Sequence, residues 1–269
     1  MLLTWVVLLA GSMGQAQAPD SRDSLVRARH AYNTGQFDVA ITAATEALGT
    51  PALANPAAVV LARAHLERYR ALSVAADLDE ARKALRLVVP DQLAPRDRAE
   101  YLLGLGVSLY LDGCTAGCLS AAAEMFNMAL ADATALDDRE RVFEWWAGAL
   151  DRQAQFGPQG ERGLIYRRIL DRAEAELSAH HQSASATYWL AAAARGAGDH
   201  ERAWGAAIAG WVRARGLGRK GDVLRTDLDR FVLEILLPER ARLQSPDEDT
   251  APALDLLKQQ WEEIKKKYL

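Results

Sequence analysis

Apolar residues recur at helical spacing along almost the whole chain. From Ser24 onward, Ala, Leu and aromatic residues return every three or four positions, and charged residues occupy the positions between them. This pattern is typical of amphipathic helices that bury one face. Alternating runs of β-branched residues, which indicate strands, are nearly absent from the sequence. The sequence therefore predicts an all-α protein.

Small residues repeat at fixed steps inside three of these helical segments. The steps are 7, 5 and 7 in two segments and 7, 9 and 7 in the third, whose middle step is four residues longer. The three sets are Ala28, Gly35, Ala40 and Ala47; Ala191, Gly198, Ala203 and Gly210; and Gly106, Gly113, Ala122 and Ala129. Small side chains let two antiparallel helices approach closely, and Gly adopts the left-handed backbone of a tight turn. The pattern predicts helical hairpins.

The segment 24–51 resembles the tetratricopeptide repeat (TPR) family. The matching positions are Ala28, Tyr32, Gly35, Phe37, Ala40, Ala47, Leu48 and Pro51. Residues 187–215 match nearly as well, the region around Gly106 matches apart from its insertion, and 57–90 and 142–170 match mainly by spacing. The resemblance implies a right-handed α-solenoid of about five TPR-like hairpins over residues 19–243, followed by C-terminal helices. An Ala-rich helical bundle is the alternative.

Beyond the last hairpin, the sequence predicts two further helices separated by a linker. Residues 221–243 form an amphipathic pattern that would cover the end of a solenoid. Residues 244–252 contain the acidic, Pro-bounded stretch SPDEDTAP, and residues 253–269 form a second amphipathic helix with Leu254, Leu257, Trp261 and Ile264 along one face.

The N-terminus predicts export. Residues 1–18 combine an apolar core with small residues before a cleavage point after Ala16 or Ala18, as in a secretory signal peptide. An apolar N-terminal helix or an uncleaved anchor is the alternative, and no other stretch predicts a membrane span. We expect a periplasmic protein. The net charge of −4 gives no basic excess for nucleic acid.

Motifs that would carry chemistry are missing from the sequence. Phosphate loops, nucleophile elbows, dinucleotide fingerprints and zinc-protease patterns do not occur. Cys114 and Cys118 are the only cysteines, and in an oxidising compartment we expect a disulfide between them rather than a redox or metal site. The stretch containing His180 and His181 is polar and reads as a solvated turn. We therefore expect no catalysis, no cofactor and no metal.

The TPR resemblance implies that the first helix of each hairpin lines a concave groove. The small residues of these helices would be Ala28, Ala62, Gly106, Gly148 and Ala191. Positions three before, one after and four after each of them would flank or face the groove. They are Leu25, Arg29, Tyr32; Val59, Arg63, Leu66; Leu103, Val107, Tyr110; Trp145, Ala149, Arg152; and Tyr188, Ala192, Arg195.

Arginine and aromatic residues recur in this set and are favoured at binding hot spots. We expect the binding residues to be Arg29, Tyr32, Arg63, Tyr110, Trp145, Arg152, Tyr188 and Arg195. The alternative to a binding role is core packing for the aromatic residues. For the arginines, the alternative is that they are exposed and form ion pairs with nearby Asp or Glu. The arginines are the stronger candidates, on the argument that a core has no use for them.

The expected function is a non-catalytic scaffold that binds a peptide or protein segment in the cell envelope. One alternative is a glycan- or nutrient-binding subunit at the outer membrane, in which Trp145, Trp146 and Trp189 would stack on sugars. Another is a cell-wall-associated enzyme subunit, although the chain has no room for a catalytic domain after its repeats.

Overall fold

The computed structural model describes residues 21–112, 116–131, 139–246 and 249–268, and within these ranges every regular element is helical. The predicted all-α class is therefore confirmed. The long helices are α1 (Ser21–Asn33), α2 (Phe37–Leu48), α3 (Ala54–Leu72), α4 (Ala75–Leu87), α5 (Pro95–Tyr110), α6 (Ala116–Ala131), α7 (Arg139–Phe156), α8 (Gln159–Ala179), α9 (Ala184–Gly196), α10 (His200–Ala214), α11 (Arg219–Phe231), α12 (Leu237–Gln244) and α13 (Ala251–Lys267). Short 3₁₀ turns at Pro51–Leu53, Pro90–Gln92 and Arg215–Leu217 join some of them.

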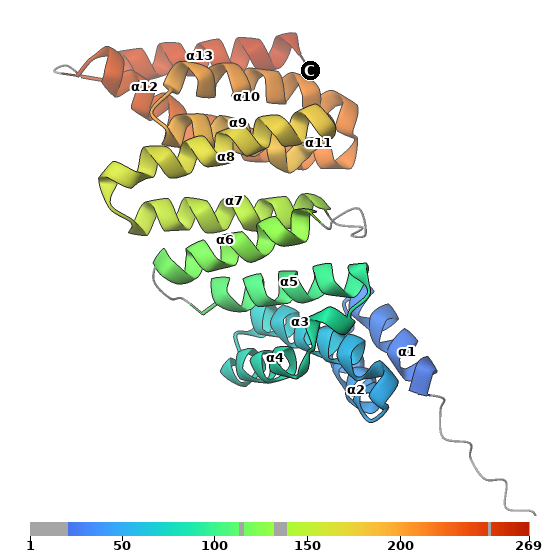
Figure 1. Ribbon diagram of the computed structural model, residues 1–269. Helices are drawn as coiled ribbons and strands as arrows, with labels where there is room; N and C mark the ends of the chain where they lie inside the picture. Colours follow the sequence, from blue (N-terminus) through green and yellow to red (C-terminus); the bar gives the residue numbers. More distant parts are fainter. Residues whose placement is uncertain (1–20, 113–115, 132–138, 247–248, 269) are drawn as a thin grey trace, which may run out of the picture.

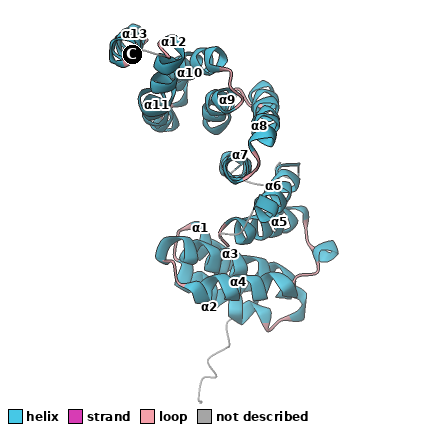
Figure 2. Ribbon diagram, turned by 90° about the vertical axis from the view of Figure 1, so that its left-hand side faces the viewer, coloured by secondary structure: helices cyan, strands magenta, loops and turns pink. Residues whose placement is uncertain are grey.

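The helices pack in chain order. Each of α1 to α10 contacts the helix that follows it, and α12 contacts α13. The odd-numbered helices also contact one another in series, α1 with α3, α3 with α5, α5 with α7, α7 with α9 and α9 with α11. Figure 1 shows the resulting row, with α1 and α2 at the lower end and α13 at the upper end. Figure 2 shows the same row from the side, with several helices viewed along their axes.

Two of the predicted hairpin turns close in the same way. Gly35 has φ of 75° and Gly198 has φ of 86°, so both adopt the left-handed backbone that the sequence predicted for them. After α1, the Gln36 N–H donates to the Ala31 carbonyl at 2.8 Å and the Gly35 N–H donates to the Tyr32 carbonyl at 3.1 Å. The corresponding pair after α9 is Asp199 to Ala194 and Gly198 to Arg195, both at 2.9 Å. This double closure satisfies the last carbonyls of each helix.

Small residues lie where helices cross, as the spacing predicted. Ala28, Ala62 and Ala191 have no exposed surface. A Cβ added to Gly106 would lie 2.5 Å from the Phe126 ring, so α5 and α6 approach too closely there for a larger residue. Gly148 differs, because the nearest atom to an added Cβ is the Tyr110 hydroxyl at 3.8 Å. The α7 crossing therefore does not require glycine.

The apolar core is divided unevenly along the row. One continuous cluster runs from α3 to α13 and contains the largest fully buried side chains, among them Trp146, Phe126, Phe143 and Trp261. Around α1, α2 and the adjoining face of α3 the core instead consists of small, separate clusters built mainly from alanine. The N-terminal end of the row thus buries less apolar volume per helix.

Residues 219–244 form one helical segment with a local widening. The turn Val232–Leu236 is π-helical and is followed directly by α12, whose second residue is Pro238. Proline lacks the N–H that an α-helix needs and its ring clashes with the carbonyl four residues earlier. A π turn before the proline accommodates both problems.

The C-terminal helix α13 covers the upper end of the row. Trp261 is fully buried, with its ring centroid 5.6 Å from that of Trp204 and 5.4 Å from that of Trp211. Its indole N–H donates to Asp229 Oδ1 at 2.7 Å, and Lys265 Nζ binds the same oxygen at 2.8 Å. The helix is thus docked on α10 and α11 rather than detached by the acidic linker.

Several sequence-based expectations lie outside the described residues. They are the signal peptide at 1–18, Cys114 of the expected disulfide and part of the linker at 247–248. Cys118 lies in α6. Among the helices of the described ranges, none has the length and apolar content that a membrane crossing needs.

Candidate peptide-binding groove

The odd-numbered helices, together with Phe37 at the start of α2, line two adjoining hollows. The first, which we call the N-terminal basin, has a volume of about 320 Å³ and is lined by Tyr32, Asn33, Gly35, Phe37, Arg63, Glu67, Arg70, Arg96, Glu100, Leu103, Arg141 and Val142. The second, the C-terminal basin, has a volume of about 610 Å³ and is lined by Glu140, Arg141, Glu144, Ala184, Ser185, Tyr188, Trp189, Lys220, Val223, Leu224, Asp227 and Arg230. Arg141 on α7 lines both, so the basins meet at that helix.

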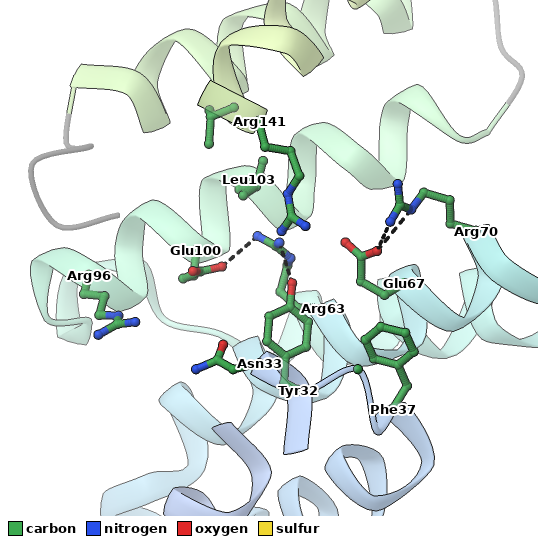
Figure 3. A pocket seen from close by; sticks show the side chains of 12 residues that line it. Tyr32, Asn33, Phe37, Arg63, Glu67, Arg70, Arg96, Glu100, Leu103 and Arg141 are labelled. Carbon is green, nitrogen blue, oxygen red and sulfur yellow. Dashed lines mark hydrogen bonds and ion pairs between the residues drawn. The ribbon is translucent and has the colours of Figure 1, made fainter. Parts of the chain in front are cut away.

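Arg63 forms the buried wall of the N-terminal basin. Its Nη1 donates to Glu100 Oε2 at 2.7 Å and its Nη2 donates to the Tyr32 hydroxyl at 2.6 Å (Figure 3). The guanidinium also lies 5.6 Å from the centre of the Tyr32 ring. Burial raises the pKa of the Tyr32 hydroxyl, and Arg63 only partly opposes that rise. Burial acts to lower the pKa of Arg63, but Tyr32 and Glu100 together outweigh it and keep the guanidinium charged.

The rim of the N-terminal basin carries further ion pairs. Arg70 and Glu67, one turn apart on α3, are paired at 2.7 Å. The Arg70 guanidinium also lies 6.0 Å from the centre of the Trp145 ring. A smaller hollow of about 210 Å³ beside the basin is lined by Arg29 and Asp97, whose side chains are 2.7 Å apart. Figure 3 shows Arg141 reaching in from α7 and Arg96 from α5. Three helices, α3, α5 and α7, therefore contribute charged side chains to the N-terminal basin.

The C-terminal basin combines an apolar surface with balanced charges. Tyr188 and Trp189 from α9 line it together with Val223, which is 59% exposed on α11. Burial, followed by the nearby carboxylate of Asp227, raises the pKa of Tyr188. At one edge, the Glu140 carboxylate accepts from the backbone N–H groups of residues 184 and 185 at the start of α9. An acid at a helix N-terminus is favourable, so Glu140 fixes α7 against α9.

The predicted binding residues are only partly brought together. Tyr32 and Arg63 line the N-terminal basin, Arg29 lines its smaller neighbour and Tyr188 lines the C-terminal basin. Arg195 lines neither basin and instead binds Glu239 of α12, with Nε to Oε2 at 2.8 Å.

The other three predicted binding residues form a packed cluster between helices. The Tyr110 and Trp145 rings meet edge to face with centroids 4.9 Å apart. Arg152 lies 4.5 Å from the centre of the Tyr110 ring and donates to the Tyr110 carbonyl at 3.3 Å. These three side chains contact one another. The two aromatic residues thus pack between helices, as their core-packing alternative predicted.

The premise that a core has no use for arginine was wrong for Arg63. It is 3% exposed and is held by a phenol and a carboxylate from two other helices. Three of the four predicted arginines are paired with carboxylates, namely Arg29, Arg63 and Arg195. Arg152 and Arg195 line neither basin.

The set of binding residues predicted from the sequence does not include the basin residues on α11. It also leaves out the charged basin residues that lie at other positions along α3, α5 and α7. Arg70 follows Ala62 by eight residues, whereas Arg141 precedes Gly148 by seven. One fixed set of offsets therefore cannot select both residues. The helix α11 follows the five expected hairpins, so no offsets were counted along it, although its charged face, with Lys220, Asp227 and Arg230, was visible as the polar side of the amphipathic pattern.

Among the residues described, no cluster of His, Cys, Asp and Glu has the arrangement of a metal site. His65, one of five histidines, is buried between helices and lies 2.8 Å from Asp77 Oδ1. Arg68 binds the same carboxylate, so this histidine belongs to an internal charge network.

No family model matches the chain. Searches of curated proteins and of solved structures also gave no match. The site therefore has to be interpreted from its own geometry.

Proposed function

We propose that this protein is a TPR-like α-solenoid that binds a segment of another protein along the groove formed by the two basins. The observation that carries the proposal is the row of odd-numbered helices, which contact one another in series and line both hollows. A row of alternate helices presents an extended concave surface, which helical-repeat proteins use for binding. No chemistry is required of such a surface.

The repeat assignment is supported by local geometry. The two segments with steps of 7, 5 and 7 begin with α1 and α9, and the turns that follow these helices have the same pair of backbone hydrogen bonds around a left-handed glycine. The helices of all five expected hairpins occur in the expected order along the chain.

The distribution of tryptophan favours a protein segment over a glycan. Stacking on sugars needs accessible ring faces. Trp146 is 1% exposed, and Trp145 packs against Tyr110 and Phe126. Of the three tryptophans considered for sugar stacking, Trp189 is the one that lines a basin. A peptide can use the mixed lining of donors, acceptors and apolar groups.

Export and the disulfide belong to the same proposal. A protein exported through a signal at 1–18 would begin near Gln17 or Pro19, and Cys114 would be bonded to Cys118. N-terminal sequencing and non-reducing mass spectrometry of the protein isolated from its native compartment test both points. A mature chain that starts at Met1, or two free thiols, would contradict them.

Site-specific photo-crosslinking tests the groove directly. A benzophenone amino acid at Val223, in the C-terminal basin, is compared with one at Leu87 of α4, which is 62% exposed and lines neither basin. We expect a discrete, protease-sensitive adduct from Val223 in cells and none from Leu87. Equal adducts from both positions, or a glycosidase-sensitive adduct, would refute binding of a protein segment in this groove.

A further inference from the structure

The C-terminal basin has an apolar centre between two charged sides. The centre belongs to α9, which contacts α7 on one side and α11 on the other (Figure 2). Its largest side chains are those of Tyr188 and Trp189, and the exposed Val223 of α11 lines the same basin. The charged lining residues all come from α7 and α11. An apolar centre inside a polar rim is typical of interfaces that anchor a side chain of a partner.

The charges around this centre are already compensated. Arg230 and Asp227, one turn apart on α11, are paired at 3.0 Å, and Lys220 of α11 lies 3.8 Å from Glu140 of α7. The other two charged residues of the lining, both on α7, also have interaction partners. A charged group of a ligand would lose its water here without gaining a free counter-charge, which is costly. The basin therefore favours an uncharged group.

Two neutral donors at the centre have no partner within the described part of the chain. No described residue accepts a hydrogen bond from the Tyr188 hydroxyl or from the indole N–H of Trp189, and both groups are accessible. Burial, followed by the charge of Asp227, raises the pKa of Tyr188, so its hydroxyl keeps its proton. Both groups can thus donate to a neutral acceptor. Main-chain carbonyls of a peptide are such acceptors.

The apolar part of the centre is fixed in place before a ligand arrives. The rings of Tyr188 and Trp189 meet edge to face with centroids 5.7 Å apart, and the Tyr188 ring also lies 6.0 Å from that of Phe231. Side chains that are already ordered lose little conformational freedom on binding. Val223 adds an aliphatic surface, which an apolar side chain covers favourably, whereas the hydroxyl groups of a sugar would find no hydrogen-bond partner on it.

We infer that the C-terminal basin anchors an uncharged stretch of the bound segment. An apolar side chain of this stretch packs against Val223 and the adjoining aromatic pair, and main-chain carbonyls beside it accept hydrogen bonds from Tyr188 and Trp189. The inference rests on the proposed groove function and adds to it the chemistry of the residue that the ligand inserts. Because the anchor is neutral, it acts on the dissociation rate and not through electrostatic steering.

Selection from a phage-displayed library of random dodecapeptides tests this chemistry. The bait is the full chain isolated from its native compartment, and the selected peptides are synthesised for affinity measurements. V223N removes apolar surface from the basin, and V26N makes the same change at an exposed valine of α1 that lines neither basin. Y188F removes the hydroxyl and keeps the ring, and Y101F is the matched change on α5 outside both basins.

We expect the selected peptides to share an apolar residue without enrichment of acidic or basic residues beside it. V223N should weaken their binding about fivefold through lost apolar burial, and Y188F about fivefold through the lost hydrogen bond. The controls V26N and Y101F should stay within about twofold of the parent. Raising the salt from about 0.05 M to about 0.5 M should not weaken binding, because no ion pair forms with the ligand. Circular dichroism and urea midpoints confirm that all four variants fold.

Photo-crosslinking of the selected peptides separates this inference from the groove function. A benzophenone amino acid is placed at Val223, at Asn33 in the N-terminal basin, or at Leu87 outside both basins. Adducts at Val223 support the anchor. Adducts at Asn33 without adducts at Val223 would overturn the anchor while the groove function stands, and so would binding that falls steeply with salt. The same holds for a V223N effect no larger than that of V26N.

Two further outcomes contradict the inference in other ways. Oligosaccharides that displace the peptides from Val223 would assign the basin to glycans. Adducts at Leu87 alone, or a library that yields no binder, would refute the groove function itself and the anchor with it.

Discussion

Arg63 is a buried charge with two partners on neighbouring helices. Its side chain is 4% exposed, and Glu100 and Tyr32 supply the hydrogen bonds that offset its desolvation. Arg29, one helix away, pairs with Asp97 but is 44% exposed, so water already solvates it. An unpaired charge is costly only where water cannot reach it. The two arginines therefore differ in what they stabilise.

Replacing each arginine with alanine should separate these roles. We expect Arg63→Ala to lower the free energy of unfolding by about 3–5 kcal/mol, because Glu100 is left half-buried without its partner. Arg29→Ala should cost less than about 1 kcal/mol. Urea denaturation at neutral pH measures both. Equal small losses would mean that Arg63 is solvated.

The charge network around Asp77 predicts a pH dependence. The hydrogen bond from Arg68 holds the pKa of the Asp77 carboxyl below its usual range, burial opposes that effect and the hydrogen bond from His65 adds to it. Arg68 also binds Asp38 of α2, so the network joins three helices. A carboxyl whose folded pKa is lowered stabilises the fold above its unfolded pKa, and this contribution is lost as the pH falls through the folded pKa.

Asp77→Asn should therefore be more harmful at neutral pH than in acid. We expect a loss of about 3 kcal/mol at pH 7, since Arg68 would lose its buried partner. The difference from the parent should shrink as the pH falls below about 3.9, the usual value for Asp. Urea midpoints measured from pH 7 to pH 3 provide the test. A difference that stays constant over this range would show that the charge of Asp77 is unimportant.

At the scale of whole helices, periodicity was sufficient to place most elements. Apolar spacing and the two turn glycines predicted hairpins that the structure has as α1 with α2 and α9 with α10. The groove was harder to predict, because which side of a helix faces it depends on how that helix packs against its neighbours. The marker Gly148 illustrates the limit, since no close crossing requires a small residue there. Offsets counted from it selected Trp145 and Arg152, which pack against Tyr110.

Close helix crossings predict opposite effects for two glycines. At Gly106, an added methyl group would meet the Phe126 ring at 2.5 Å, whereas at Gly205 of α10 it would meet nothing within 4 Å. We expect Gly106→Ala to destabilise the protein by about 1–3 kcal/mol through overpacking. Gly205→Ala should stabilise it by about 0.5–1 kcal/mol, the ordinary gain of alanine inside a helix. Thermal and urea unfolding measure both, and effects of the same sign would contradict the crossing geometry.

The molecule as a whole is held together by contacts between helices that are close in sequence. Stability in such a row need not be uniform, because each helix depends on its immediate neighbours. The small, separate alanine clusters around α1 and α2 bury less than the continuous core from α3 to α13. We infer that the N-terminal helices open first.

Hydrogen exchange should report this gradient. We expect the amides of α1 and α2 to exchange faster than those of α6, α7 and α9, which lie within the continuous core. Exchange followed by mass spectrometry under native conditions measures it peptide by peptide. Protection that is equal from α1 to α9 would indicate a single cooperative unit.

The position of α13 has a consequence for how many molecules can join end to end. If the last helix of a row exposes its apolar face, the first helix of another copy can pack against it. Head-to-tail contacts of this kind build filaments when they do not close into a ring. Trp261 packs against Trp204 and Trp211, so we infer that α13 prevents such growth at this end of the row. We expect a variant that ends at Gln244 to form polydisperse, concentration-dependent polymers in light scattering, while the full chain does not. A truncated chain of uniform, unchanged size would show that the exposed end has no affinity for another copy.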